Sequence, residues 1–300
     1  MSAVPAPPAG NGARLSVVGA GRVGQTLAHL LVQKLGLRAH QVFCRQQAHA
    51  EEAASFIGQG TALSEFAALS ASDIWLIGVP DSSIENTANA LAELAQRSGW
   101  PPAIAFHCSG FCASDKLAAL RQLGWSVASV HPALNFANPA QAVRQFSGTL
   151  CGIEGDETAA RWLNEAMAAI GGQVFSLDAS TKVLYHAAAV FCSNFTIALQ
   201  DMAQQAWRSA GLPDEVIAPL NRQLLETSVR NALALGPPKA ITGPAARGDA
   251  KTVQTQMQAV SDWSADAGHI YQLLSEAAYR LAQQGNSLAS GPGLLQRPSP

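Results

Sequence analysis

The sequence predicts an α/β protein in which a mostly parallel β-sheet is followed by an all-helical C-terminal domain. Up to Asp178, short apolar runs alternate with segments of helical spacing, and after Asp178 only helical spacing remains. Short apolar runs joined by helices are typical of parallel strands that are buried on both faces. A glycine-rich turn after the first apolar run is the third observation, and it also indicates a function.

Each expected element follows from its own pattern. Short apolar runs predict strands at residues 15–18, 41–44, 73–80, 103–110, 125–132, 149–155 and 173–178. Apolar residues at helical spacing predict helices at 25–36, 83–98, 114–123 and 157–170. Glycine and proline end two long helices in the C-terminal part, 179–210 and 214–235, and further helices are expected near 250–260 and 263–284.

The composition excludes several classes of protein. There are 19 Lys and Arg residues against 21 Asp and Glu, so no basic surface is expected for binding nucleic acid. The five cysteines are an odd number with no secretory signal before them, which indicates a reducing, cytoplasmic compartment. No apolar run reaches the ~18 residues that a membrane span needs, so we expect a soluble protein without a membrane partner.

A glycine motif follows the first apolar run: Gly19, Ala20, Gly21, Arg22, Val23 and Gly24. Between a strand and a helix, this spacing is the fingerprint of the Rossmann fold, which binds a dinucleotide pyrophosphate at the helix N-terminus. We expect Gly19 to make the tight turn, Gly21 to let the backbone approach the phosphates, and Gly24 to allow close helix packing. A purely structural turn is the alternative.

Arg45 is expected to select the cofactor. In a domain that prefers NAD, an acidic residue about 20 positions after the motif binds the ribose 2′-hydroxyl. Arg45 occupies that place, and a guanidinium pairs with a 2′-phosphate, so the sequence predicts NADP. An exposed arginine at a strand end is the alternative. Val79 and Pro80 end a later strand and are expected beside the nicotinamide half.

Four further motifs complete a resemblance to a known group of enzymes. They are His107-Cys108-Ser109-Gly110, Ser129-Val130-His131-Pro132, the run from Tyr185-His186 to Ser193-Asn194, and the loop from Thr242 to Asp249. With the glycine motif they make residues 14–285 resemble the superfamily of β-hydroxyacid dehydrogenases, pyrroline-5-carboxylate reductase and 6-phosphogluconate dehydrogenase. More narrowly, the chain resembles a Rossmann-like family whose helical half is a domain of unknown function. The Ser-Gly-Ser-Gly-Pro run of pyrroline-5-carboxylate reductases is absent, which argues against that activity.

The predicted division has four parts: a tail (1–13), an NADP-binding Rossmann domain (14–178), a helical substrate and dimerisation domain (179–285), and a second tail (286–300). The length supports two domains, because single cores stop growing near ~250 residues. Both tails are rich in Pro, Gly, Ser and Ala, and we expect them to be disordered. The resemblance implies hydride transfer at a domain cleft and a homodimer held by the helical domains.

Hydride transfer to a carbonyl or imine needs a proton donor close to the nicotinamide. His107 and Ser109 end one expected strand and His131 ends the next, at the edge where the cofactor should lie. We expect Ser109 and His131 at the reacting centre and His107 in contact with the substrate. Structural histidines are the alternative. A zinc site with Cys108 and Cys112 fits poorly, because C-x₃-C is looser than the usual knuckle, and no metal is expected.

Lys182 and His186 are the other catalytic candidates. With Ala189 and Ser193 they follow i, i+4, i+7, i+11 spacing, so they share one face of the expected helix, close to a substrate contact at Asn194. Related enzymes carry a catalytic lysine, and an asparagine one turn later, on the corresponding helix. A solvated lysine beside a core histidine is the alternative.

The loop from Thr242 to Asp249 offers further contacts. The guanidinium of Arg247 suits a carboxylate or phosphate, so Thr242 and Arg247 are expected to contact the substrate. The superfamily implies that such a loop can approach the active site of the other subunit. Asp249 is a natural N-cap for the next helix, and a capped connector with a surface arginine is the alternative.

Taken together, these patterns predict an NADP-dependent oxidoreductase that transfers a hydride to or from a small carbonyl, hydroxy or imine acid. A non-catalytic NADP-binding sensor is the alternative from another class. The His-Pro step after a strand leaves a prephenate-dehydrogenase-like activity as a third hypothesis. The helix at 179–210 is apolar on several faces, which predicts that a partner copy covers it.

Overall fold

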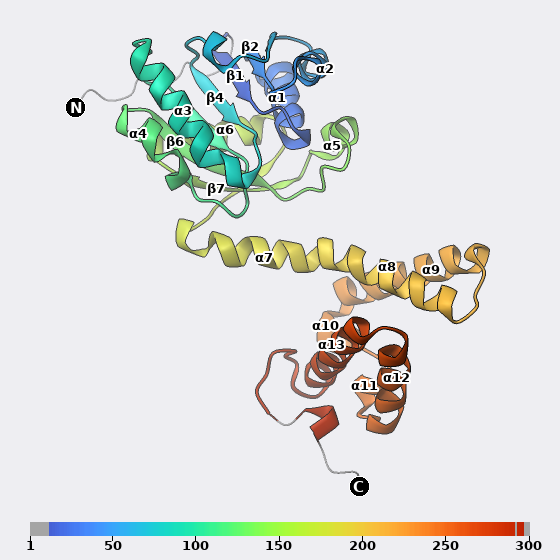
Figure 1. Ribbon diagram of the computed structural model, residues 1–300. Coiled ribbons are helices and arrows are strands. Elements are labelled where there is room, and N and C mark those ends of the chain that lie inside the picture. The colour runs from blue at the N-terminus through green and yellow to red at the C-terminus, as the bar shows by residue number, and fades with distance from the viewer. Residues whose placement is uncertain (1–11, 292, 297–300) are drawn as a thin grey trace. The chain divides into compact units, whose positions relative to one another are not determined.

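The computed structural model describes residues 12–291 and 293–296, and Figure 1 shows their helices and strands. The chain forms two compact units, Met1–Val190 and Phe191–Pro300. Most of the expected N-terminal tail, up to residue 11, lies outside the described residues. The first unit contains the whole sheet and the first part of the expected helix 179–210, up to Val190. The last strand ends at Ser176, whereas the two units divide after Val190. The change from strands to helices and the division between the units therefore fall at different residues.

A single sheet organises the first unit. Its strand order is β3-β2-β1-β4-β5-β6-β7-β8, and all neighbours are parallel except β6 and β7. The order reverses between β1 and β4, which is the switch point where open α/β sheets bind ligands. The predicted α/β class is confirmed. The strands are β1 (Arg14–Val18), β2 (Arg38–Phe43), β3 (Thr61–Leu63), β4 (Ile74–Ile77), β5 (Ile104–His107), β6 (Ser126–Pro132), β7 (Leu150–Gly155) and β8 (Gln173–Ser176).

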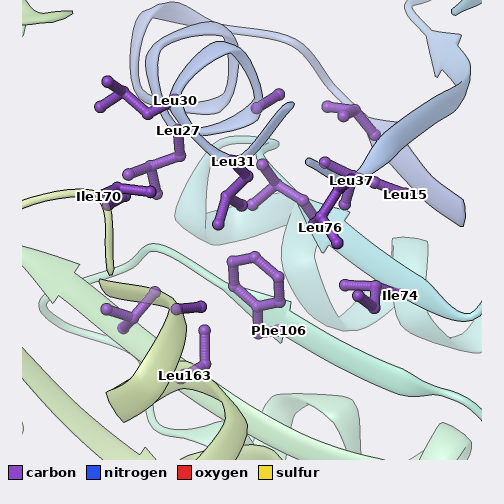
Figure 2. Close-up of a cluster of buried hydrophobic side chains, with 14 of the residues drawn as sticks. Leu15, Leu27, Leu30, Leu31, Leu37, Ile74, Leu76, Phe106, Leu163 and Ile170 are labelled. Carbon is purple, nitrogen blue, oxygen red and sulfur yellow. The ribbon is translucent and has the colours of Figure 1, made fainter. Parts of the chain in front are cut away.

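Helices cover both faces of this sheet. Along β4, Ile74 and Leu76 belong to one buried cluster, while Trp75 and Ile77 belong to the other. Figure 2 shows part of the first cluster, where Leu27 and Leu31 pack with Phe106. Burial on both sides explains why β4 is an unbroken apolar run. The first cluster is covered by α1 (Arg22–Leu35), α2 (Gln47–Ile57), α5 (Pro139–Gln145) and α6 (Glu157–Ala169), the second by α3 (Ile84–Arg97) and α4 (Ala118–Gln122).

Three elements of the first unit were not predicted. Strand β3 spans only Thr61–Leu63, which is too short to show a period, and it is an edge strand beside β2. Helix α2 follows β2 directly, and α5 begins with Pro139 after an N-cap at Asn138. The cap side chain accepts a hydrogen bond from the backbone N–H of Gln141, a local signal of a helix start that the periodicity did not reveal.

The rest of the chain is helical, as predicted, with one difference in the first long helix. The expected helix over 179–210 is interrupted at Ser193, where φ is −109° and ψ is −69°. Ser193 donates a hydrogen bond to Asn194 Oδ1 at 2.8 Å, and short polar side chains of this kind compete with the helical backbone. The helices are α7 (Lys182–Cys192), α8 (Asn194–Ser209), α9 (Asp214–Leu235), α10 (Pro237–Ala240), α11 (Pro244–Arg247), α12 (Ala250–Trp263) and α13 (Ala265–Gln284).

One described part of the expected C-terminal tail has ordered structure, whereas residues 292 and 297–300 of that tail lie outside the described residues. Leu294 is buried in a small cluster with Val253 and Tyr279, and residues Leu294–Gln296 form a 3₁₀ turn. The carboxylate of Glu276 accepts the backbone N–H groups of Leu294 and Leu295 at 2.7 and 2.8 Å. Two adjacent leucines therefore supply enough apolar burial to fix this part of a tail that is otherwise rich in small residues.

The stretch Ala179–Ser209 bears on the expectation that the chain has no membrane span. Among the described residues it is the one helical stretch long and apolar enough to cross a membrane, with a mean hydropathy of 1.3. Polar residues interrupt it, so counting uninterrupted apolar runs did not find it. No residue of its most apolar window is fully buried in the described structure, and Leu184, Phe191 and Ile197 are exposed. Length and composition alone are weak evidence for a membrane span, and an exposed apolar helix also indicates an interaction surface.

Candidate functional site

A cavity of about 750 Å³ lies at the switch point of the sheet. The glycine turn, the residues that follow β2 and β4, and the first turns of α3 form its walls. Such a crevice at the carboxyl ends of β1 and β4 is where a Rossmann fold holds its dinucleotide. The residues around it include Gly19, Ala20, Gly21, Arg22, Arg45, Gln46, His49, Glu52, Val79, Pro80, Ser83, Asn86 and Thr87.

The glycine turn has the geometry that phosphate binding requires. Gly19 has a φ of +81°, and a Cβ atom there would lie 2.5 Å from Val79 Cγ1. A Cβ on Gly24 would lie 3.0 Å from the carbonyl oxygen of Gly19, so a larger residue would push α1 away from the turn. Helix α1 begins after Gly21 with no side-chain cap and no acidic residue in its first turn. Its N-terminal N–H groups and positive dipole end are suited to an anion.

The structure brings most of the expected cofactor residues together. All of them line the cavity except Val23 and Gly24, which pack inward and hold α1 against the sheet. Arg45 is exposed just beyond the end of β2, in the place where an acidic residue would bind a ribose 2′-hydroxyl. Arg22 and His49 line the same cavity. This donor set fits a phosphate on the ribose better than it fits a free hydroxyl.

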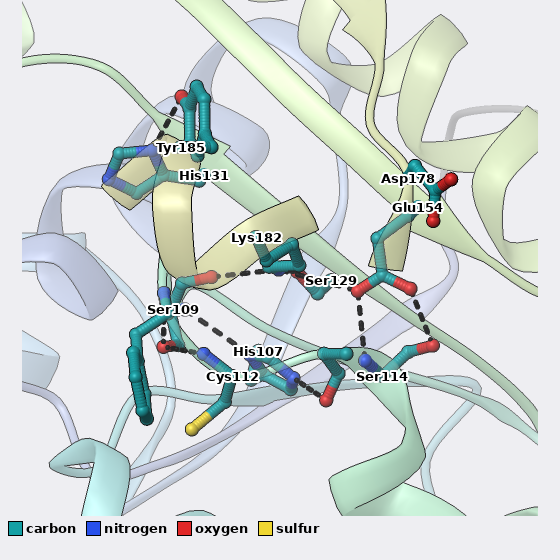
Figure 3. A network of polar contacts seen from close by, with 12 residues as sticks. His107, Ser109, Cys112, Ser114, Ser129, His131, Glu154, Asp178, Lys182 and Tyr185 are labelled. Carbon is teal, nitrogen blue, oxygen red and sulfur yellow. Dashed lines mark hydrogen bonds and ion pairs between the residues drawn. The ribbon is translucent and has the colours of Figure 1, made fainter. Parts of the chain in front are cut away.

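A second polar cluster lies at the ends of β5 and β6 and at the start of α7 (Figure 3). Lys182, the first residue of α7, is completely buried. Its ammonium group donates to the carbonyl oxygen of Ser109 at 3.0 Å, to Ser129 Oγ, and to Glu154 Oε1 at 3.3 Å. An ammonium group has three hydrogens, so these contacts use all of them. Lys182 therefore fastens the start of α7 to the sheet.

Glu154, the counter-ion of Lys182, was missed in the sequence. It lies on β7 and accepts both the backbone N–H and the hydroxyl of Ser114 at 2.8 Å, in addition to the Lys182 ammonium. Burial lowers the pKa of Lys182, and the carboxylate of Glu154 opposes that effect. The signal in the sequence was a single carboxylate inside an apolar strand, which is rare unless the charge is paired.

One turn further along α7, Tyr185 and His186 contact His131 at the end of β6. Tyr185 Oη and His131 Nδ1 are 2.8 Å apart. The two imidazole rings pack edge to face, with centroids 5.5 Å apart and an angle of 85°. Burial first, and then the nearby His186 and Lys182, lower the pKa of His131 to about 4, so its ring is neutral at neutral pH. The buried Nδ1 of His186 has no hydrogen-bond partner among the described residues.

Gly110 allows both histidines to come close to the turn after β5. A Cβ atom on Gly110 would lie 2.5 Å from His186 Nδ1 and 2.8 Å from His131 Nε2. Both nitrogens therefore approach the same side of Gly110. Any larger residue would displace the rings, and with them this part of α7.

His107 and Ser109 organise that same turn. Ser109 N–H donates to His107 Nδ1 at 3.2 Å, so the ring proton is on Nε2 and donates to the Ala113 carbonyl at 3.1 Å. Burial lowers the pKa of His107 to about 4. Ser109 Oγ accepts the N–H groups of Phe111 and Cys112. Both nitrogens of His107 thus have protein partners, whereas the hydroxyl hydrogen of Ser109 is not used by these two bonds.

The remaining predicted substrate contacts lie in the second unit. Asn194 begins α8, Thr242 precedes α11, and Arg247 ends it. Asp249 caps α12 as expected, since its Oδ1 accepts the N–H of Thr252 at 3.1 Å. The described residues of neither unit contain three His, Cys, Asp or Glu side chains placed to hold a metal ion.

Sequence comparisons agree with the fold and with the glycine turn, which define the first unit as a Rossmann-type domain. A family model for a Rossmann-like domain matches residues 6–132, and a model for a domain of unknown function, DUF2520, matches residues 149–278. The chain therefore combines a match to a Rossmann-like domain with a match to DUF2520, which confirms the narrower resemblance seen in its sequence. No protein of curated function matches it.

Solved structures share this fold along most of the chain. A protein from Thermotoga maritima has 24% identity and a TM-score of 0.69, covering 90% of this chain and 99% of its own. A candidate NADP oxidoreductase from Bacteroides fragilis has 23% identity and a TM-score of 0.71, covering 89% of this chain and 98% of its own. A pyrroline-5-carboxylate reductase from Coxiella burnetii has 14% identity and a TM-score of 0.53, covering 91% of this chain and 99% of its own. At these identities the likeness concerns the fold.

Proposed function

We propose that this protein is an NADP-dependent oxidoreductase acting on a small carbonyl, hydroxy or imine acid. The observation that carries the proposal is a dinucleotide-sized cavity on the same sheet edge as a pair of histidines. The cavity lies at the ends of β1 and β4, and the histidine cluster lies by β5 and β6, the next strands in the sheet. Cys112 Sγ also contacts the Asp81 carbonyl at 3.9 Å, which links the turn after β5 to the residue that follows Pro80.

Different residues of the cavity bind different parts of the cofactor. The N-terminus of α1 and the backbone of Gly19 to Gly21 take the pyrophosphate, and Arg45, with Arg22, takes the 2′-phosphate. Val79 and Pro80 border the nicotinamide half, at the side that leads to the histidine cluster. Two solved neighbours support this class of reaction. One is named as a candidate NADP oxidoreductase, and the other, a pyrroline-5-carboxylate reductase, acts on a cyclic imine acid by name.

The histidine cluster supplies the proton chemistry. When bound, the nicotinamide supplies or accepts the hydride. His186 is the proton donor in the reducing direction, because its buried Nδ1 has no partner in the described protein and can engage the substrate oxygen or nitrogen. His131 lies beside it, and Ser109 supports the turn under both rings. Lys182 acts by positioning α7, since its three hydrogens are already engaged.

Turnover distinguishes this proposal from a non-catalytic NADP sensor. We expect the protein to consume NADPH steadily with at least one member of a panel of small oxo-acids and cyclic imines. Candidates for the panel come from a thermal-shift screen with NADPH present, because a ligand of the folded holoprotein raises its apparent stability. Tight NADPH binding with no turnover across the panel would favour the sensor and overturn the enzyme.

The cofactor preference depends on Arg45. We expect NADPH to bind more tightly than NADH by about 10- to 100-fold, the equivalent of one charged hydrogen-bonded contact, in a calorimetric titration. Arg45→Asp should reverse the order, because a carboxylate repels the 2′-phosphate and can accept from a 2′-hydroxyl. Arg161→Asp, the same charge change on the exposed side of α6, is the matched control and should leave the preference unchanged. Equal affinities of the unaltered protein for NADPH and NADH would show that Arg45 does not select the cofactor.

We also propose a homodimer formed through the helical unit. On α8, Phe195 and Ile197 are exposed, and on α9 the side chain of Leu233 is 84% exposed. Surfaces of this kind are usually covered in solution. Light scattering should report a dimer, and Ile197→Asp should shift it toward monomer. Leu288→Asp, at a side chain that is also exposed but lies outside these helices, should not. A monomer at micromolar concentration would contradict the proposal.

A further inference from the structure

The two ring nitrogens of His131 have different surroundings. Nδ1 is 2.8 Å from the hydroxyl oxygen of Tyr185. Nε2 lies on the other side of the ring, close to Gly110, and a Cβ on Gly110 would be 2.8 Å from it and 2.5 Å from His186 Nδ1. Figure 3 shows Tyr185 reaching His131 from α7 on the side away from Ser109. Tyr185 therefore acts on one nitrogen, and the candidate reacting centre lies beside the other.

The direction of the Tyr185 hydrogen bond follows from the chemistry of both groups. A neutral imidazole carries a single N–H, and its other nitrogen is a good acceptor. A phenol is a strong donor, and burial raises the pKa of Tyr185, so the hydroxyl keeps its proton at neutral pH. This chemistry favours the hydroxyl of Tyr185 as the donor to Nδ1, with the single ring proton of His131 on Nε2. His107 below has the same arrangement, with its proton on Nε2 as well, fixed by the N–H of Ser109.

We propose that Tyr185 is a positioning residue that fixes His131 in the Nε2–H tautomer. His131 then presents a hydrogen-bond donor, rather than a lone pair, on the side of Gly110 where the unpartnered His186 Nδ1 lies. A substrate oxygen or nitrogen held there meets one fixed donor, His131 Nε2–H, and the unpartnered Nδ1 of His186. The catalytic part of this inference rests on the proposed oxidoreductase function, and the tautomer itself does not.

The surroundings of His131 are consistent with a neutral ring. The titratable and charged groups near it are His186 and Tyr185 on α7, Lys182 one turn earlier, and Asp81 after β4. His186 and Lys182 disfavour a positive charge on His131, and Asp81 opposes them more weakly. A neutral ring must choose between two tautomers, and Tyr185 is the one described side chain hydrogen-bonded to it.

The tautomer can be tested without any substrate by nuclear magnetic resonance of the full-length protein. Its histidines are labelled with the heavy isotope of nitrogen for this purpose. Long-range nitrogen–proton correlations at neutral pH should show His131 with a protonated Nε2 and an unprotonated Nδ1, with the signals assigned through His131→Asn. In Tyr185→Phe they should move toward a mixture of tautomers. Tyr271→Phe is the matched control, because it removes a hydroxyl that donates over the same 2.8 Å, to Gln256 in the second unit. A proton on Nδ1 in the unaltered protein would overturn the proposal even if no variant folds.

Kinetics then test the catalytic part. With NADPH and any substrate found in the panel, Tyr185→Phe should lower kcat by about 10- to 100-fold, the usual size when a partner that orients a histidine is lost. KM and NADPH affinity should change little, and Tyr271→Phe should behave as the unaltered protein. Unchanged kcat in Tyr185→Phe would contradict a positioning role. If the tautomer is fixed but no substrate is turned over, the assignment of Tyr185 stands and the oxidoreductase proposal fails.

Discussion

Lys182→Met is expected to lower the free energy of unfolding by about 3–5 kcal/mol, because it leaves the charge of Glu154 buried without its counter-ion. Both side chains are almost fully inaccessible, so water cannot replace the lost contact. The variant also removes the hydrogen bonds to Ser109 and Ser129 that hold the start of α7. Urea unfolding followed by circular dichroism gives the change in free energy, provided that the transition remains two-state.

Two controls separate the buried pair from a general effect of losing a lysine. Lys116 forms an exposed ion pair with Glu85 at 2.8 Å, and Lys116→Met should cost less than about 1 kcal/mol. In the double variant Lys182→Met with Glu154→Gln, no buried charge is left unpaired, so the loss should be smaller than in Lys182→Met alone. If Lys182→Met cost no more than Lys116→Met, the anchoring role assigned to Lys182 would be wrong.

His186→Ala is expected to reduce turnover by ~10²-fold or more, the size typical of a lost general acid. NADPH affinity should stay nearly intact, because His186 does not line the cofactor cavity. Stopped-flow turnover and a parallel NADPH titration measure the two effects separately. We expect a large effect because Nδ1 of His186 is buried and has no hydrogen-bond partner among the described residues. A bound substrate would supply that partner.

The matched control for this change is His40→Ala. His40 hydrogen-bonds only the Ser70 hydroxyl among the described side chains, at 3.0 Å, and lies on β2 outside the cavity lining. It should leave turnover unchanged. A His186→Ala protein that melts at a lower temperature but turns over normally would show a structural role for His186 and would make His131 the proton donor.

The fold of the first unit could be predicted because its signals are local. The glycine turn at Gly19 to Gly24 stands between an apolar strand and a helix, and central strands such as β4 give short apolar runs. Such patterns depend on neighbours in the sequence, which is why the sheet, the cavity and the place of Arg45 were all expected. The interruption at Ser193 was not, because a single serine in a helix-forming segment is usually tolerated.

The polar cluster could be predicted only in part, because its contacts join distant parts of the chain. His131, Lys182 and His186 were identified by type and spacing, but Lys182 is 28 residues from Glu154 and 73 from Ser109. The ion pair with Glu154 needs the antiparallel return of β7 beside β6, which no local pattern encodes. Tyr185 belongs to one of the sequence motifs, but no role was predicted for it because its partner His131 lies 54 residues away. Lys182 was expected to be a catalytic residue, and its three contacts instead make it an anchor for the start of α7.

A crystal structure of the complex with NADPH tests the central claim most directly, namely that the cavity and the histidine cluster form one site. We expect the pyrophosphate at the N-terminus of α1 and the 2′-phosphate on Arg45. The nicotinamide should lie beside Val79 and Pro80 with its reactive carbon open toward Gly110 and His186. A cofactor bound with its nicotinamide directed away from the histidines, or bound outside the cavity, would contradict the account.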